Sequence, residues 1–209
     1  MKAGSDQATP WLRRPGHRGL LAFAATIAVV GRANAHIVPS QAVGFTAGIA
    51  HPFSGLDHML AMICVGMWGA QLGQPAIWLL PVTFPMIMAL GGFLGLIGVS
   101  LPGAELGVAL AALVLGTAVM LAWRPRLWMA SAIVGVFGLY HGYAHGVELP
   151  PGGDALLYSA GFVAATGCLH LCGIALGLVH RWRWGCYVVR AAGTGIAITS
   201  VTFLWNAVY

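Results

Sequence analysis

The residues of this 209-residue sequence that are best suited to chemistry are histidines and carboxylates set inside apolar segments. An ionisable side chain at the centre of a spanning helix costs about 2.5–3.5 kcal/mol on the insertion scale, so each one needs a functional reason. The first group is His51, Asp57 and His58, in HPFSGLDH. On a continuous helix the two histidines would share a face, with the aspartate about 120° away. Pro52 instead predicts a kink or a break, and broken helices at membrane depth line cavities and transport sites.

The second group is His141, His145 and Glu148, in the segment HGYAHGVE. Their spacing of four and then three residues allows all three side chains to share one helix face. Two imidazoles one turn apart with a carboxylate nearby form a common chelating arrangement for borderline metals. The pair alone is a weak signal, because histidines with satisfied hydrogen bonds also occur inside helix bundles.

The segments that carry these groups are too apolar for a soluble domain. Hydrophobic residues make up 59% of the chain and charged residues 7%, against about 45–50% and about 25% in ordinary soluble proteins. Apolar runs long enough to cross a bilayer recur, with glycine and proline at the joins. We predict an all-α, polytopic transmembrane helix bundle of about six spans, over residues 41–71, 76–99, 103–123, 127–147, 155–179 and 185–207.

The N-terminal segment is typical of an export signal. It has a basic n-region with Arg13, Arg14 and Arg18, an apolar stretch over residues 19–30 and a small-x-small cleavage pattern at residues 33–35. We therefore predict a cleaved signal peptide over 1–35 and one transmembrane domain over 36–209, with an uncleaved first helix as the alternative. Half of the ten basic residues lie in this segment, so the net charge of +5 does not indicate nucleic-acid binding.

The charges of the loops fix an orientation. A periplasmic mature N-terminus puts the arginines at residues 124, 126, 181 and 183 on the cytoplasmic side of a bacterial inner membrane. His51 and Glu148 then lie in the outer half, level with Glu105, whose alternative role is to interact with a helix dipole. His36 would be the first mature residue and could capture metal with its amine and imidazole. The predicted metal ligands are His36, His51, Asp57, His58, Glu105, His141, His145 and Glu148.

The four cysteines all lie within apolar segments, which argues against a disulfide framework. Cys168 and Cys172 share a face of the fifth span, and His170 points roughly the other way. A buried cysteine is often only a small hydrophobe, so we do not expect thiolate ligation. A polar role for His170 stays open.

Two sequence motifs resemble those of the HupE/UreJ family of hydrogenase and urease accessory membrane proteins, regarded as nickel permeases. They are HPFSGLDHMLAMICVGMWGAQLG, with its H-x5-D-H pattern, and YHGYAHGVE at residues 140–148. The resemblance covers nearly the whole chain. It implies nickel uptake for a nickel enzyme, with a metallochaperone or enzyme-maturation proteins as partners, and it implies functional roles for the motif histidines and carboxylates. Glu105 matches only through its place in the third span.

The function that we predict is an inner-membrane permease for Ni²⁺, with no enzymatic activity and no tightly bound cofactor. No P-loop is evident, and the membrane potential favours inward movement of a divalent ion by roughly 4.6 kcal/mol per 100 mV. Cobalt and zinc stay open as cargo, because affinity alone does not select nickel. The rival classes are an intramembrane zinc-dependent hydrolase and a haem carrier with paired axial histidines.

Overall fold

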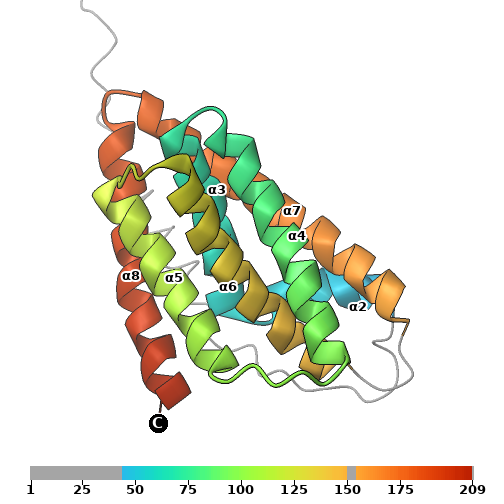
Figure 1. Cartoon of the computed structure of the whole chain (residues 1–209). Coiled ribbons are helices and arrows are strands. Elements are labelled where there is room, and N and C mark those ends of the chain that lie inside the picture. Colours follow the sequence, from blue (N-terminus) through green and yellow to red (C-terminus); the bar gives the residue numbers. More distant parts are fainter. Residues whose placement is uncertain (1–43, 150–153, 209) are drawn as a thin grey trace, which may run out of the picture. The chain divides into compact units, whose positions relative to one another are not determined.

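The computed structural model describes residues 44–149 and 154–208. The chain divides into two units, Met1–Ile37 and Val38–Tyr209, and all described residues belong to the second. The predicted signal peptide and His36 lie outside them. The described part is all-α, as predicted, with no strand among its residues (Figure 1). Its elements are α2 (Phe45–Ala50), η2 (His51–Phe53), α3 (Leu56–Leu72), α4 (Ala76–Leu96), α5 (Ala104–Leu121), α6 (Leu127–Glu148), α7 (Ala155–Leu178), η3 (Val179–Arg181) and α8 (Gly185–Val208).

The five helices from α4 to α8 are long and apolar enough to cross a membrane. Their ends lie within three residues of the predicted spans, because the glycines and prolines at the joins mark the helix ends. The first predicted span, residues 41–71, differs from the others, since α2, η2 and α3 follow one another there. The total of six spans therefore stays a prediction, whereas a multi-pass membrane protein is the fold that these helices build.

The break in the first predicted span lies at Pro52, as the sequence predicts. Helix α2 ends at Ala50, a single 3-10 turn follows, and Gly55 has an extended backbone with φ −109° and ψ 117°. A new helix, α3, begins at Leu56 with Asp57 in its first turn, where a carboxylate interacts favourably with the helix dipole. The first motif therefore occupies two helix ends and the turn between them.

The helices pack most extensively in the pairs α4–α6, α5–α8 and α3–α7, and α2 packs on α7. Glycines allow the backbones to touch. A Cβ added at Gly142 of α6 would overlap the Met88 carbonyl of α4, and one at Gly66 of α3 would overlap the His170 carbonyl of α7. Such contacts between small residues and backbone are how helices associate in lipid. They also fix the rotation of the helices that carry the two motifs.

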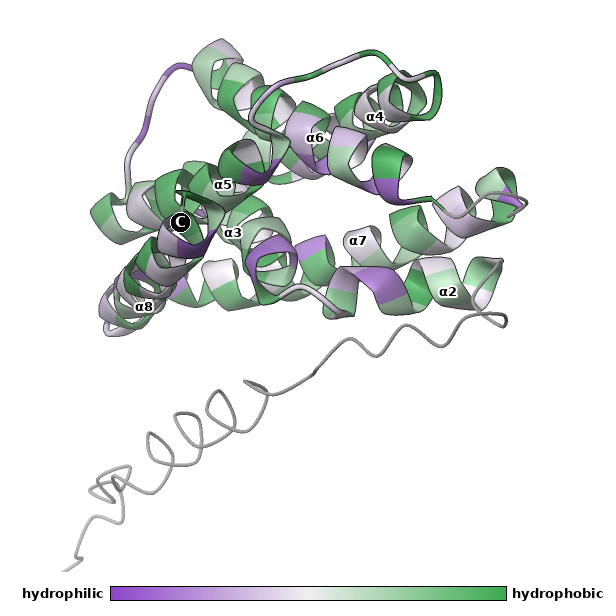
Figure 2. Cartoon of the chain, turned by 90° about the horizontal axis from the view of Figure 1, so that it is seen from below, coloured by the Kyte–Doolittle hydropathy of each residue, from purple (hydrophilic) through white to green (hydrophobic). Residues whose placement is uncertain are grey.

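Large apolar side chains cover the outward faces of the long helices. Met86 on α4 and Ile198 on α8 are each 67% exposed, which suits contact with lipid tails. Figure 2 shows hydrophobic residues along most of the helical surface, with hydrophilic segments on α3, α6 and α7. Buried side chains such as Trp68 and Phe84 fill the interior between the helices. Histidines among these buried side chains are therefore held away from lipid.

The C-terminal end of α5 is stabilised by side chains from two other helices. Gln71 of α3 donates to the Val119 carbonyl at 3.1 Å, and Arg190 of α8 donates to the Met120 carbonyl at 2.8 Å. These bonds add donors to carbonyls of the last helical turn, where the Val119 carbonyl also accepts from the Ala122 backbone N–H at 3.1 Å. Ala122 ends α5 in the left-handed conformation, with φ 48°. These bonds connect α3 and α8 to α5 at the end of the bundle that does not carry the two motifs.

Candidate metal centre

Three potential ligand atoms from the two motifs meet at one point. The Nε2 atom of His51 lies 2.9 Å from Nδ1 of His145 and 3.6 Å from Oε2 of Glu148. The remaining side, between His145 Nδ1 and Glu148 Oε2, measures 3.9 Å. Two donors that are each about 2.1 Å from one ion lie roughly 3.0–3.4 Å apart. We call His51, His145 and Glu148 the outer triad; its geometry fits one metal ion after small adjustments.

The environment of the outer triad makes it accessible from one side. The Glu148 side chain is 62% exposed, whereas that of His145 is 8% exposed. The His51 ring lies against Tyr158 and Phe162 of α7, with centroid distances of 5.7 and 6.0 Å. An ion can therefore approach past the carboxylate, while the aromatic side chains hold the imidazoles in place.

His58 and His141 extend the cluster inward. The Nδ1 atom of His58 donates to Oδ1 of Asp57 at 2.9 Å, and Nδ1 of His141 donates to the Phe137 carbonyl at 2.8 Å. In a neutral imidazole the other nitrogen, Nε2, then carries the lone pair. Both Nε2 atoms are buried and have no hydrogen-bond partner. A histidine held by its Nδ1 proton on a carboxylate or a carbonyl, with Nε2 free, is how proteins present an imidazole to a metal.

His145 connects the two levels. Its Nδ1 atom belongs to the outer triad, and its Nε2 atom is buried without a hydrogen-bond partner. Its ring centroid lies 4.7 Å from that of His58, which lies 4.9 Å from that of His141. We call His58, His141 and His145 the inner histidines. One imidazole thus faces both groups, so an ion could move from the first to the second without leaving nitrogen ligands.

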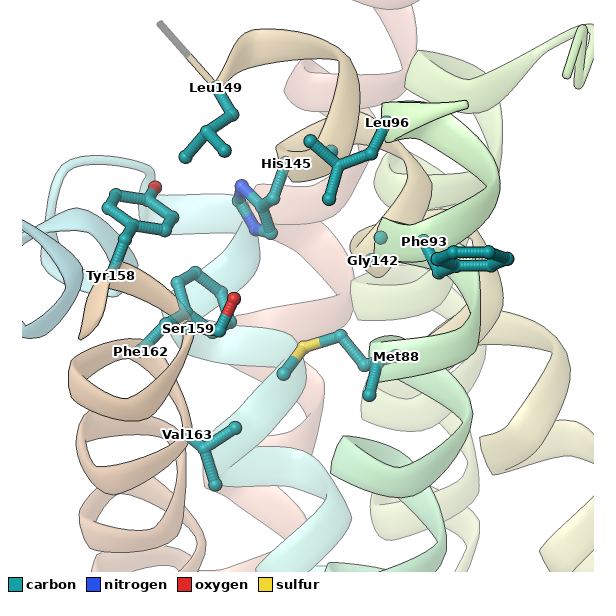
Figure 3. A pocket seen from close by; sticks show the side chains of 13 residues that line it. Met88, Phe93, Leu96, Gly142, His145, Leu149, Tyr158, Ser159, Phe162 and Val163 are labelled. Carbon is teal, nitrogen blue, oxygen red and sulfur yellow. The ribbon is translucent and has the colours of Figure 1, made fainter. Parts of the chain in front are cut away.

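A cavity of about 170 Å³ adjoins His145 between α4, α6 and α7, large enough for several water molecules (Figure 3). His145 and Leu149 lie toward one end of it, and Met88 and Val163 toward the other. Its polar side chains are His145, Tyr158 and Ser159. The cavity gives a partly hydrated ion room beside the cluster.

The structure brings together six of the eight predicted ligands. They are His51, Asp57, His58, His141, His145 and Glu148. Glu105 has an exposed side chain in the first turn of α5, and it is not part of the one group of three or more ligand atoms found among the described residues. Its helix-dipole role accounts for that position. His36 lies outside the described residues.

The cysteines and the histidine of the fifth predicted span lie on different faces of α7, as the sequence predicts. Cys168 and Cys172 are exposed on the outer face of α7, and His170 is buried. The sequence reasoning did not identify Tyr158 and Phe162, whose rings pack on His51. The available signal was their spacing of four residues on the buried side of a spanning helix.

The chemistry of the cluster is that of imidazole nitrogens with carboxylate oxygens. Such donors suit Ni²⁺, Co²⁺, Zn²⁺ and Cu²⁺, whereas Mg²⁺ and Ca²⁺ prefer oxygen alone. The two exposed cysteines contribute no thiolate here, because both lie on the lipid-facing side of α7. The described cluster is therefore a candidate site for a borderline divalent metal.

Comparison with known proteins agrees with this description. A family profile described as "HupE / UreJ protein" matches residues 24–203, which include all six clustered residues. "Protein HupE" of Rhizobium leguminosarum bv. viciae is 42% identical over 180 residues, covering 86% of this chain and 94% of that protein. No solved structure matches significantly. With most of its length and both histidine motifs inside the matched region, this chain belongs to the HupE/UreJ family.

Proposed function

We propose that this chain is a permease that carries Ni²⁺ across a bacterial inner membrane to supply a nickel enzyme such as a hydrogenase or a urease. The observation that carries the proposal is the outer triad, with its three ligand atoms within 4.8 Å of one another inside a membrane bundle. An ionisable group as buried as His145, with 8% of its side chain exposed, is costly in that setting, and its convergence with His51 and Glu148 has a ready explanation in cation binding. Nickel as the cargo comes from the family resemblance.

The arrangement of the histidines suits passage as well as binding. A carrier site must bind the ion well enough to take it up and weakly enough to let it go. His145 belongs to both the outer triad and the inner histidines, so ligands can be exchanged one at a time. Protonation of an imidazole removes its lone pair and releases the metal, which offers a means of discharge.

The driving force need not come from nucleotide hydrolysis. An inward divalent ion gains roughly 4.6 kcal/mol from a membrane potential of 100 mV, negative inside. The arginines at residues 124, 126, 181 and 183 lie at the end of the bundle opposite the outer triad. By the positive-inside rule that end is cytoplasmic, so the outer triad would face the periplasm.

The test is uptake of radiolabelled Ni²⁺ by cells expressing the chain, with Co²⁺, Zn²⁺ and Cu²⁺ as competitors. We expect saturable uptake that His145→Ala abolishes, because this residue belongs to both ligand groups. His180→Ala is the matched control, since His180 donates to the Gly177 carbonyl at the opposite end of the bundle. The ranking of competitors identifies the cargo, and strongest inhibition by Co²⁺ would make the chain a cobalt permease.

Two results would contradict the proposal. One is a correctly inserted wild-type chain that takes up no more of any of these metals than cells with an empty vector. The other is undiminished uptake by well-expressed His145→Ala. Either result would bring forward the intramembrane hydrolase, which predicts metal-dependent hydrolysis by the purified protein.

A further inference from the structure

A second buried polar group lies deeper in the bundle, outside both histidine motifs. His170 on α7 is 2% exposed, and neither of its ring nitrogens has a hydrogen-bond partner. Thr166, one turn earlier on the same helix, is fully buried, and its hydroxyl also has no partner. Residues four apart on a helix share a face, so the two polar groups face the same region.

The Thr166 hydroxyl, like that of Ser131 on α6, is buried without a hydrogen-bond partner, whereas several other helical hydroxyls in the described residues bond to their own helix. A threonine or serine inside a helix ordinarily donates to the carbonyl four residues back. Thr117, Thr194, Thr199 and Ser200 all form that bond, at 2.7–2.9 Å. Thr166 does not, which leaves its oxygen available to a ligand.

A backbone carbonyl from α4 adds a third donor. Pro85 has no N–H, so the carbonyl of Pro81, four residues earlier, lacks its usual helical donor. This Pro81 carbonyl lies near the His170 imidazole without forming a hydrogen bond to it. Carbonyls freed inside broken or kinked helices are recurrent ion ligands in transporters. An imidazole, a hydroxyl and a carbonyl together form a nitrogen–oxygen donor set for a borderline divalent ion.

Phe84 links this group to the inner histidines. Its buried ring lies 5.3 Å from the His141 centroid and 5.5 Å from the His170 centroid. Along α7, His170 is two turns beyond Phe162, whose ring contacts His145, a rise of about 12 Å. The displacement is directed toward the arginine-bearing end of the bundle. The group is thus the next polar position beyond the cluster in the direction of transport.

We propose that His170, Thr166 and the Pro81 carbonyl form a second ion-binding position, which receives the transported metal from the inner histidines past Phe84. This inference rests on the proposed permease function and adds an ion-binding position whose residues lie outside both motifs. The position is rigid, because the backbone of α7 at His170 touches Gly66 of α3. Phe84 then acts as the barrier between the two positions, since its ring contacts an imidazole of each.

The experiment compares the wild-type chain with His170→Leu in two measurements. Equilibrium dialysis of the purified protein against radiolabelled Ni²⁺ gives the number of bound ions, and uptake by cells gives transport. We expect His170→Leu to bind one ion fewer per chain at saturation, to keep its affinity at the outer triad within about twofold, and to lower uptake by more than about tenfold. Cys168→Ala, on the opposite and exposed face of α7, is the matched control and should behave as wild type.

The outcomes separate this inference from the proposed function. If the wild type takes up Ni²⁺ and His170→Leu matches it in both ion number and uptake, His170 is only a packing residue and the second position is refuted. If the wild type neither binds nor carries Ni²⁺, the permease proposal itself fails. Should His170→Leu not fold, Thr166→Val removes one hydroxyl at nearly constant volume. It should lower uptake severalfold, and wild-type uptake by that variant would also overturn the proposal.

Discussion

Gly142 offers a direct test of whether the contact between α4 and α6 positions the histidines. It lies next to His141 and lines the cavity that also contains His145. A Cβ at this position would overlap the Met88 carbonyl and its neighbouring backbone atoms. No side-chain rotation relieves that overlap, so Gly142→Ala must push the two helices apart by on the order of 1 Å before ordinary contact is restored.

The size of the effect follows from the cost of overpacking. Inserting a methyl group into a well-packed interior costs about 1–3 kcal/mol. Where the strain is relieved by movement of α6, the imidazoles shift relative to the ligands on α2 and α3. If the whole of this strain falls on the metal-bound form, it corresponds to a loss of about 5- to 150-fold in metal affinity. We therefore expect both a lower midpoint of thermal unfolding and weaker binding of Ni²⁺.

The assay is equilibrium dialysis of Ni²⁺ with purified protein, together with thermal unfolding in the same detergent. Gly135→Ala is the control, because it lies on the same helix and its added Cβ would come no closer than 3.7 Å to another residue. That substitution should leave binding unchanged and stabilise the helix by up to about 1 kcal/mol. Wild-type affinity and wild-type unfolding in Gly142→Ala would refute the reasoning, since the helices could not then be in backbone contact at this point.

Three further substitutions test separate features of the structure. Glu148→Gln keeps the shape of the outer triad but removes its charge, and it should weaken Ni²⁺ binding in dialysis by about 10- to 100-fold; unchanged affinity would exclude Glu148 as a ligand. Asp154→Ala removes the N-cap that accepts hydrogen bonds from the backbone of Leu156 and Leu157, so the free energy of unfolding should fall by about 0.5–2 kcal/mol, with uptake per folded molecule preserved. Ala122→Gly replaces a left-handed alanine, and it should raise the unfolding midpoint by relieving about 1 kcal/mol of strain, whereas a lower midpoint would contradict that assignment.

Much of the fold can be predicted from the sequence, because the relevant signals are local. Apolar length defines the spanning helices, and glycine and proline mark where they end. Pro52 and Gly55 predict the break in the first span, for the same reason. Alternation of direction between helices joined by short connections then places His51 and Glu148 at the same end of the bundle.

The finer geometry of the site cannot be predicted in the same way, because it depends on how each helix is rotated about its axis. The sequence predicts a break between His51 and His58, but not which residues each imidazole then contacts. The structure places His51 in the turn after α2, against His145, and places His58 at the start of α3. Glu105 occupies the predicted end of its helix, yet its exposed side chain is not among the residues of the outer triad. These positions depend on how the helices pack against one another, including the close backbone contacts at Gly66 and Gly142, which sequence spacing alone does not specify.

The unpartnered nitrogens are the feature that connects stability with function. Each buried polar atom without a hydrogen bond costs about 1–3 kcal/mol, and the Nε2 atoms of His58, His141 and His145 all belong to this class. A bundle optimised only for packing would have apolar side chains at these positions. The Nδ1 protons of His58 and His141 are held by an acceptor in each case, which leaves the lone pair of Nε2 directed at the interior. The cost is offset when a cation accepts those lone pairs, so the metal-free chain should be the less stable form.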